Sequence, residues 1–72
     1  MNDFTIRSYT KKELALTYFP ASDPHVAVTR LVRWINRCKP LHAALLGQGY
    51  QKTSKWLSPR EVKLITQYLG EP

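Results

Sequence analysis

The sequence has 72 residues, the length of one small domain, since domains usually contain about 50 to 250 residues. Hydrophobic residues make up 43% of it, which is too large a share for a disordered tail. The longest apolar stretch is far shorter than the ~18 residues of a membrane helix, and the first four residues lack the basic and apolar regions of a signal peptide. These features exclude a membrane span and predict one globular domain, residues 1–72, located in the cytoplasm.

The charge is strongly positive and unevenly distributed. Eleven Lys and Arg residues against five Asp and Glu residues give a net charge of +6, with an isoelectric point near 9.8. No carboxylate occurs between Asp23 and Glu61, whereas seven cations do: Arg30, Arg33, Arg37, Lys39, Lys52, Lys55 and Arg60. Such an excess favours a polyanionic partner, most simply nucleic acid. The alternative is a solvated basic surface without a partner.

The first elements are a short strand and a helix. Residues 4–9 alternate loosely between apolar and polar, which predicts a strand with Phe4 and Ile6 on one face. Thr10 and Glu13 have the spacing of a capping box, in which each side chain accepts a hydrogen bond from the other residue's amide. The predicted helix therefore covers residues 10–19, where the following proline ends it.

The second helix is the clearest amphipathic element. Asp23 provides an N-cap and Pro24 a favourable first residue, so we predict a helix over residues 24–38. A helical projection gathers one apolar face: Ala27, Val28, Leu31, Trp34, Ile35 and Cys38. Apart from Val26, the opposite face is cationic or neutral and polar: His25, Thr29, Arg30, Arg33, Asn36 and Arg37.

Two further helices follow. Pro40 ends the second helix and opens a third over residues 41–46, which the Gly47–Gly49 segment closes. Residues 50–57 are predicted to form an extended arm. This arm is one of three things: a strand paired with residues 4–9, a basic wing, or a loop. A second capping box, from Ser58 to Glu61, starts a last helix that stops at Gly70.

The predicted fold class is therefore mainly α, with about four short helices in a helix-turn-helix-like bundle. A small two-stranded element accompanies them if residues 4–9 and 50–57 pair. In a helix-turn-helix the second helix enters the major groove of DNA, which makes helix 24–38 the candidate recognition helix. The candidate base readers are His25, Thr29 and Arg30. The candidate phosphate contacts are Arg33, Arg37, Lys39, Lys11 and Lys12, of which Arg33 could take either role.

The arm supplies a second candidate surface. Lys52 and Lys55 could contact the DNA backbone as a wing, and Trp56 could stack on an unpaired base. Tryptophans in so small a domain more often fill the core, however, and we expect Trp34 and Trp56 to do so.

Double-stranded DNA is the predicted partner. Because one short helix reads only a few base pairs, useful affinity would need a homodimer or a partner protein. The main alternative is a protein-interaction module whose basic face docks an acidic partner. The same basic stripe is also compatible with a plain solvated helix face.

Catalytic and metal sites are not expected. Cys38 and His42 stand four residues apart, but Pro40 interrupts the helix that would align them, and zinc sites need three or four ligands. Cys38 is interpreted as a small buried apolar residue. We expect no enzymatic activity, no cofactor and no metal.

Several stretches together resemble one family of short bacterial proteins, the domain of unknown function 4248. They are residues 4–9, 13–15, 18–20, 30–31, 34–35, 49–50, 57–59, 62, 64–65 and 69–72. The resemblance covers nearly the whole chain and implies no particular activity, partner or site residue. The segment Lys11–Ala15 also resembles, more weakly, the first helix of bacterial helix-turn-helix proteins.

Overall fold

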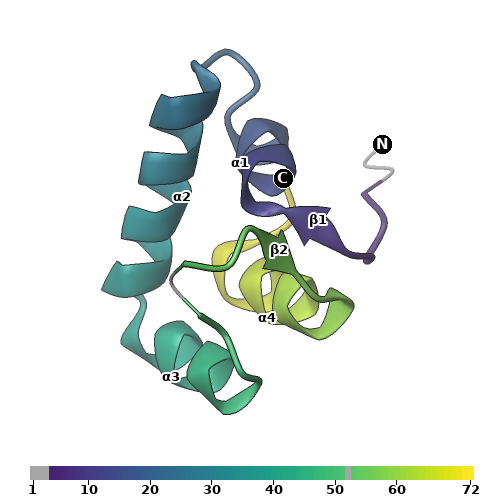
Figure 1. The fold of residues 1–72 in the computed structure, drawn as a ribbon, viewed down its shortest axis with the longest axis vertical. Helices are drawn as coiled ribbons and strands as arrows, with labels where there is room; N and C mark the ends of the chain where they lie inside the picture. Colours follow the sequence, from purple (N-terminus) through teal and green to yellow (C-terminus); the bar gives the residue numbers. More distant parts are fainter. Residues whose placement is uncertain (1–3, 52) are drawn as a thin grey trace.

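The computed structural model describes residues 4–51 and 53–72. Within these ranges the elements in chain order are β1 (Tyr9–Thr10), α1 (Lys11–Tyr18), α2 (Pro24–Arg37), α3 (Lys39–Gly47), β2 (Trp56–Leu57) and α4 (Pro59–Leu69). Helix α2 forms one side of the molecule, α1 and α4 lie across from it, and α3 lies at the C-terminal end of α2 (Figure 1). The mainly α class with four helices and a two-stranded element is thereby confirmed for the described residues.

Local side-chain hydrogen bonds fix where the helices begin. The Thr10 hydroxyl accepts from the Glu13 amide at 3.0 Å, and the Glu13 carboxylate accepts from the Thr10 amide at 2.9 Å. Ser58 and Glu61 repeat this exchange at 3.2 and 2.7 Å. Asp23 accepts from the amide of the second α2 residue at 3.0 Å. Each bond satisfies a helix amide that has no partner within the helix, so the predicted starts of α1, α2 and α4 are confirmed.

The core is mostly aliphatic, with Tyr9 and Tyr50 also buried, and it lies beneath α2. Ala27, Leu31 and Ile35 recur every four residues and are essentially inaccessible to solvent, which places them on one face of that helix. Other elements meet them with Leu14, Ala15, Leu41, Leu45, Leu57, Val62 and Ile65. This arrangement leaves the outer face and both flanks of α2 for contact with solvent or a partner.

The two strands are much shorter than predicted. They pair antiparallel, with Tyr9 opposite Leu57 and Thr10 opposite Trp56, so the predicted pairing forms only at these positions. The Phe4 ring stacks on Tyr9 with centroids 5.4 Å apart, and the Tyr9 hydroxyl donates to the Thr5 carbonyl at 2.7 Å. These contacts fold residues 4–8 back on Tyr9, away from the partner arm. The expected strand over residues 4–9 is therefore wrong in extent.

The expected core positions of both tryptophans are also wrong. Trp56 is 61% exposed, because side chains alternate along a strand and the adjacent Leu57 takes the inward position. Trp34 is 39% exposed at the edge of the buried face of α2, where its ring packs against Phe19 and Tyr18 at centroid distances of 4.8 and 6.2 Å. Trp34 and its two aromatic neighbours thus lie at the rim of the core.

The third helix begins two residues earlier than predicted. Cys38, with φ −86° and ψ 87°, separates α2 from α3, and Pro40 lies in the first turn of α3. A proline is tolerated there because that amide has no partner within the helix. Cys38 is half-buried, not fully buried.

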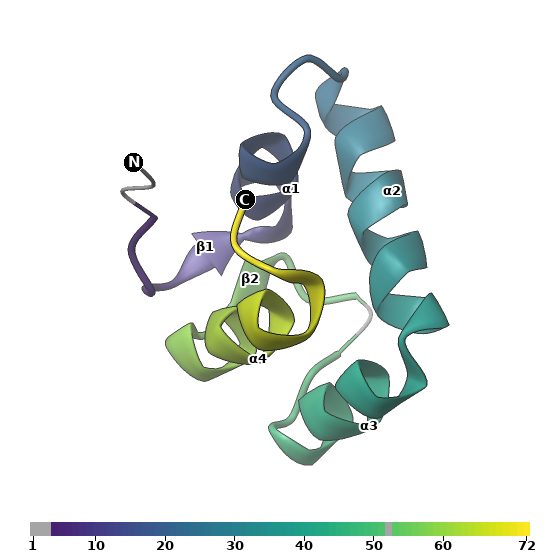
Figure 2. The same cartoon turned by 180° about the vertical axis from the view of Figure 1, so that it is seen from behind.

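Seen from behind, the β pair lies between α1 and α4, and the C-terminal end of the chain returns to α1 (Figure 2). The Tyr18 hydroxyl donates to the Gly70 carbonyl there. No helix within the described ranges has the length and apolar character needed to cross a bilayer.

Candidate nucleic-acid interface

Three arginines and two aromatic rings occupy one flank of α2. Arg30, Arg33 and Arg37 are spaced three and four residues apart, so they lie on the same side of the helix. Together with Phe19 and Trp34 they line a shallow hollow of about 180 Å³. We call these five residues the arginine flank. The Arg30 guanidinium carbon lies 5.6 Å from the centroid of the Phe19 ring, within the range of a cation–π contact.

The charge of this flank is not neutralised within the described part of the chain. All three arginines are exposed, and the described residues place no carboxylate in an ion pair with them. Glu13, Asp23 and Glu61 instead accept hydrogen bonds from backbone amides at the starts of helices. The carboxylates that could have cancelled the positive charge are thus used as helix caps.

The aromatic side of the flank is anchored to the C-terminal end. Tyr18 packs edge-on against Trp34 and donates its hydroxyl proton to Gly70. Burial, assisted by the negative charge of Glu71, raises the pKa of Tyr18 to about 12. The hydroxyl therefore stays protonated, and remains a donor, throughout the physiological pH range.

The remaining candidates, on α2 and at the start of α3, are exposed but differ in the hydrogen-bonding groups that they present. His25 lies in the first turn of α2 with its side chain exposed. The Thr29 hydroxyl donates to the His25 carbonyl at 3.0 Å, so its proton is already used and its oxygen is left as an acceptor. Lys39 is exposed at the start of α3 and continues the positive charge beyond Arg37.

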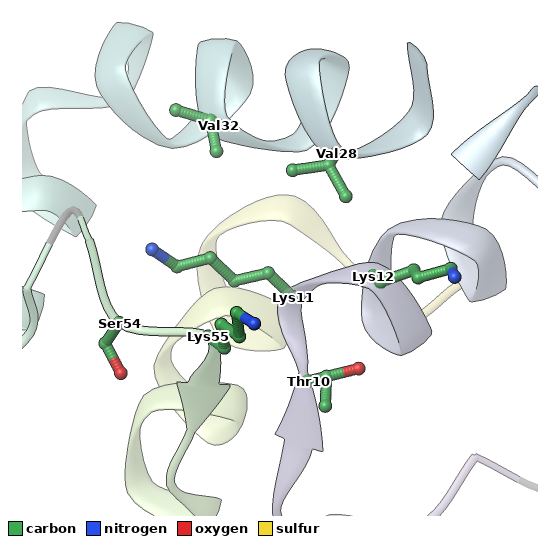
Figure 3. A pocket seen from close by; sticks show the side chains of 7 residues that line it. All are labelled: Thr10, Lys11, Lys12, Val28, Val32, Ser54 and Lys55. Atoms are coloured by element: carbon green, nitrogen blue, oxygen red, sulfur yellow. The ribbon is translucent and has the colours of Figure 1, made fainter. Parts of the chain in front are cut away.

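Three other predicted contacts lie on the opposite flank of α2. Lys11, Lys12 and Lys55 surround a cleft of about 430 Å³ whose other lining residues are Val28, Val32, Thr10 and Ser54. We call this the lysine cleft. Figure 3 shows both valines reaching from α2 toward Lys11, with Lys55 across from them. The lysines are therefore not continuous with the arginine flank.

Lys11 differs most from its predicted role as a backbone contact. It is only 8% exposed, and its ammonium group donates to the Gln51 carbonyl at 3.2 Å. The same nitrogen lies 4.9 Å from the centroid of the Tyr50 ring. Burial lowers the pKa of Lys11, and the negative charge of Glu61 partly opposes this effect. The side chain therefore forms a wall of the cleft, with its ammonium group directed toward Gln51 and Tyr50.

Two of the seven central cations remain, Arg60 and Lys52. Arg60 lies with Lys63 beside a separate hollow on α4, and Lys52 lies outside the described residues.

The helical projection does not identify Val32 as a lining residue of the cleft, because this residue falls at the border between the apolar and polar faces. Among residues 4–51 and 53–72, no three His, Cys, Asp or Glu side chains gather as a metal site would require.

Comparison with known proteins returns one family. No curated protein and no solved structure matches the chain significantly. The model of a domain of unknown function, DUF4248, matches residues 5–72. This match includes every helix and strand described above, together with the capping residues that start α1, α2 and α4. The chain therefore belongs to the DUF4248 family.

Proposed function

We propose that the protein binds double-stranded DNA through α2, with the arginine flank against the phosphate backbone. The observation that carries the proposal is the exposure of Arg30, Arg33 and Arg37 on one flank, without a carboxylate partner among the described residues. Arg30 and Arg37 are separated by about 10 Å along the helix. One DNA strand carries a charge for every ~3.4 Å of its axis, so several phosphates come within reach of this stripe.

The arrangement of α1 and α2 supports the same proposal. The two helices pack against each other across the short segment 19–23, and α2 presents its polar face outward. In a helix-turn-helix the residues near the start of the second helix read base edges. His25 and Arg30 would take that role here, Thr29 would act as an acceptor, and Arg33, Arg37 and Lys39 would contact phosphates.

The proposal extends to the assembly and location of the protein. One α2 helix covers only a few base pairs, so specific binding would require a second copy or a partner protein on the same site. Lys12 and Lys55 would contact the backbone only where DNA passes over the lysine cleft. Binding to chromosomal DNA would place the protein in the cytoplasm.

A charge reversal on the arginine flank tests the proposal. Arg33→Glu should weaken duplex binding by about tenfold, because it removes one phosphate contact and adds repulsion. The melting temperature should stay nearly unchanged, since Arg33 is exposed. Lys63→Glu is the matched control, because it makes the same change in net charge on α4.

The salt dependence of duplex affinity provides an independent test of the proposal. In fluorescence-anisotropy titrations, the slope of log affinity against log salt should be about −0.9 per phosphate contact. It should become shallower by about one contact in Arg33→Glu. A folded sample without detectable duplex binding at about 50 mM salt would contradict DNA binding. Equal losses in both variants would contradict the placement of the binding site on the arginine flank.

The exposure of Trp34 among three arginines favours one alternative, an acidic protein partner. Tryptophan and arginine are the residues that most often dominate binding energy at protein interfaces. In this case one dominant partner should be captured after nuclease treatment. Arg33→Glu should release that partner and Lys63→Glu should retain it.

A further inference from the structure

We infer that the lysine cleft binds a small organic anion that carries an apolar group, such as a medium-chain carboxylate. This inference is independent of DNA binding, because the cleft lies on the opposite flank of α2 from the arginines. Its volume of about 430 Å³ falls within the range of about 300–1,000 Å³ that is typical of small-molecule sites.

The apolar part of the site is a pair of valines. Val28 and Val32 are one helical turn apart on α2, and both side chains point into the cleft (Figure 3). Each is only partly buried by the rest of the chain, so apolar surface stays in contact with water. A hydrocarbon group placed there would remove that surface from water, which is favourable in proportion to the area covered.

The charged residues that line the site are all cationic. Lys12 and Lys55 are exposed at the cleft, and no carboxylate is among its lining residues. Lys11 adds a third positive charge from the wall, where its ammonium group is already oriented by Gln51. Because three cationic side chains and no carboxylate line the cleft, this arrangement favours an anionic head group over a neutral one.

The combination of lysines and valines disfavours ligands that are only charged or only apolar. An inorganic anion or a DNA phosphate would use the lysines but would leave the valines exposed to water. A neutral hydrocarbon would cover the valines and leave the lysines unused. An anion with an apolar tail can cover the valines and pair with the lysines at the same time. Charge complementarity favours it over a cationic or neutral amphiphile.

The four valines of the chain allow cleft residues to be compared with residues outside the cleft in one NMR experiment. Val28 and Val32 line the cleft, whereas Val26 is 45% exposed elsewhere on α2 and Val62 is buried in the core. In NMR spectra of the methyl-labelled protein, octanoate should shift the resonances of Val28 and Val32 saturably. The resonances of Val26 and Val62 should stay in place, which excludes non-specific adsorption and unfolding.

Two matched ligands separate the contributions. Acetate carries the charge without the tail, and 1-octanol carries the tail without the charge. Both should bind much more weakly than octanoate. If either shifts the two valines at the same concentration as octanoate, the site is a plain anion site or a plain apolar patch, and the inference is wrong.

A pair of charge reversals completes the test. Lys12→Glu with Lys55→Glu should weaken octanoate binding by about tenfold or more, because two attractive contacts become repulsive. Both residues are exposed, so the fold should be retained. Arg60→Glu with Lys63→Glu makes the same change in net charge on α4 and should leave octanoate affinity within about twofold of the original.

The outcome also distinguishes a macromolecular occupant. If octanoate leaves Val28 and Val32 unshifted while an acidic peptide or duplex DNA shifts them, the cleft belongs to an interface with that partner and the small-molecule inference is overturned. Loss of duplex binding in Arg33→Glu with intact octanoate binding would show that the two flanks act separately.

Discussion

The two flanks of α2 carry the same sign of charge on different chemical backgrounds. On the arginine flank, planar guanidinium groups lie beside Phe19 and Trp34 over a shallow hollow of about 180 Å³. On the other flank, Lys11, Lys12 and Lys55 line a cleft of about 430 Å³ together with Val28 and Val32. Guanidinium groups stack on rings and form paired hydrogen bonds with phosphate, whereas lysines act as point charges on flexible stems. The positive charge on both flanks favours an anionic partner, and the side chains around the charges favour a different class of anion on each flank.

The largest expected effect comes from the residue that supports both flanks. Leu31 is fully buried between them, so Leu31→Ala should reduce the free energy of unfolding by about 2–5 kcal/mol. That is a large share of the roughly 4–11 kcal/mol expected for 72 residues. Both DNA and octanoate binding should then fall together, in contrast to the one-sided effects of the charge reversals. Chemical denaturation followed by circular dichroism measures the change.

Thr29→Ala is the control on the same helix, since Thr29 is exposed and should change stability by no more than about 0.5 kcal/mol. A loss below about 1 kcal/mol in Leu31→Ala would show that α2 does not depend on this contact, and the two flanks would then lack a common support.

A smaller effect on stability should appear at alkaline pH and should come from Tyr18, which packs against Trp34 of the arginine flank. The pKa of Tyr18 is about 12 in the folded protein and near 10 when the side chain is exposed, so the folded state retains the proton longer. The contribution of Tyr18 to stability is therefore complete below pH 10 and is lost as the pH rises toward 12. Because Tyr18 is only half-buried, solvent screening limits this loss to the order of 1 kcal/mol.

The measurement compares Tyr18→Phe with the original protein between pH 9 and pH 12. The two proteins differ only at residue 18, so the difference between their melting curves isolates Tyr18. The variant should be less stable at neutral pH, where it lacks the bond to Gly70, and the gap should narrow as the pH rises. A constant gap would mean that Tyr18 ionises without cost in the folded state.

The smallest expected effect is spectroscopic and separates the two tryptophans. Trp34 lies in the arginine flank, whereas Trp56 is outside it on β2. Duplex DNA should therefore change the fluorescence of Trp56→Phe, in which Trp34 remains, more than that of Trp34→Phe. The opposite order would indicate that the arm with Lys55 and Trp56 contacts the DNA, as a wing or by base stacking.

Agreement between sequence and structure is best where contacts are local. Thr10 with Glu13 and Ser58 with Glu61 form their bonds across three residues, so the helix starts can be read directly from the sequence. Disagreement is greatest where packing decides. Trp34 fits the apolar face on a projection, but its position at the edge of that face leaves it 39% exposed.

The sequence alone determined the mainly α class, the starts of α1, α2 and α4, and a basic outer face on α2, because these depend on hydrogen bonds and periodicities within a few residues. Only the tertiary structure separated the cations onto two flanks. That separation depends on contacts between distant segments, such as the 2.8 Å bond from the Lys11 amide to the Lys55 carbonyl. This bond brings the start of α1 and the arm together beneath Val28 and Val32. The two segments are far apart in the sequence, so no local sequence pattern predicts the contact between them.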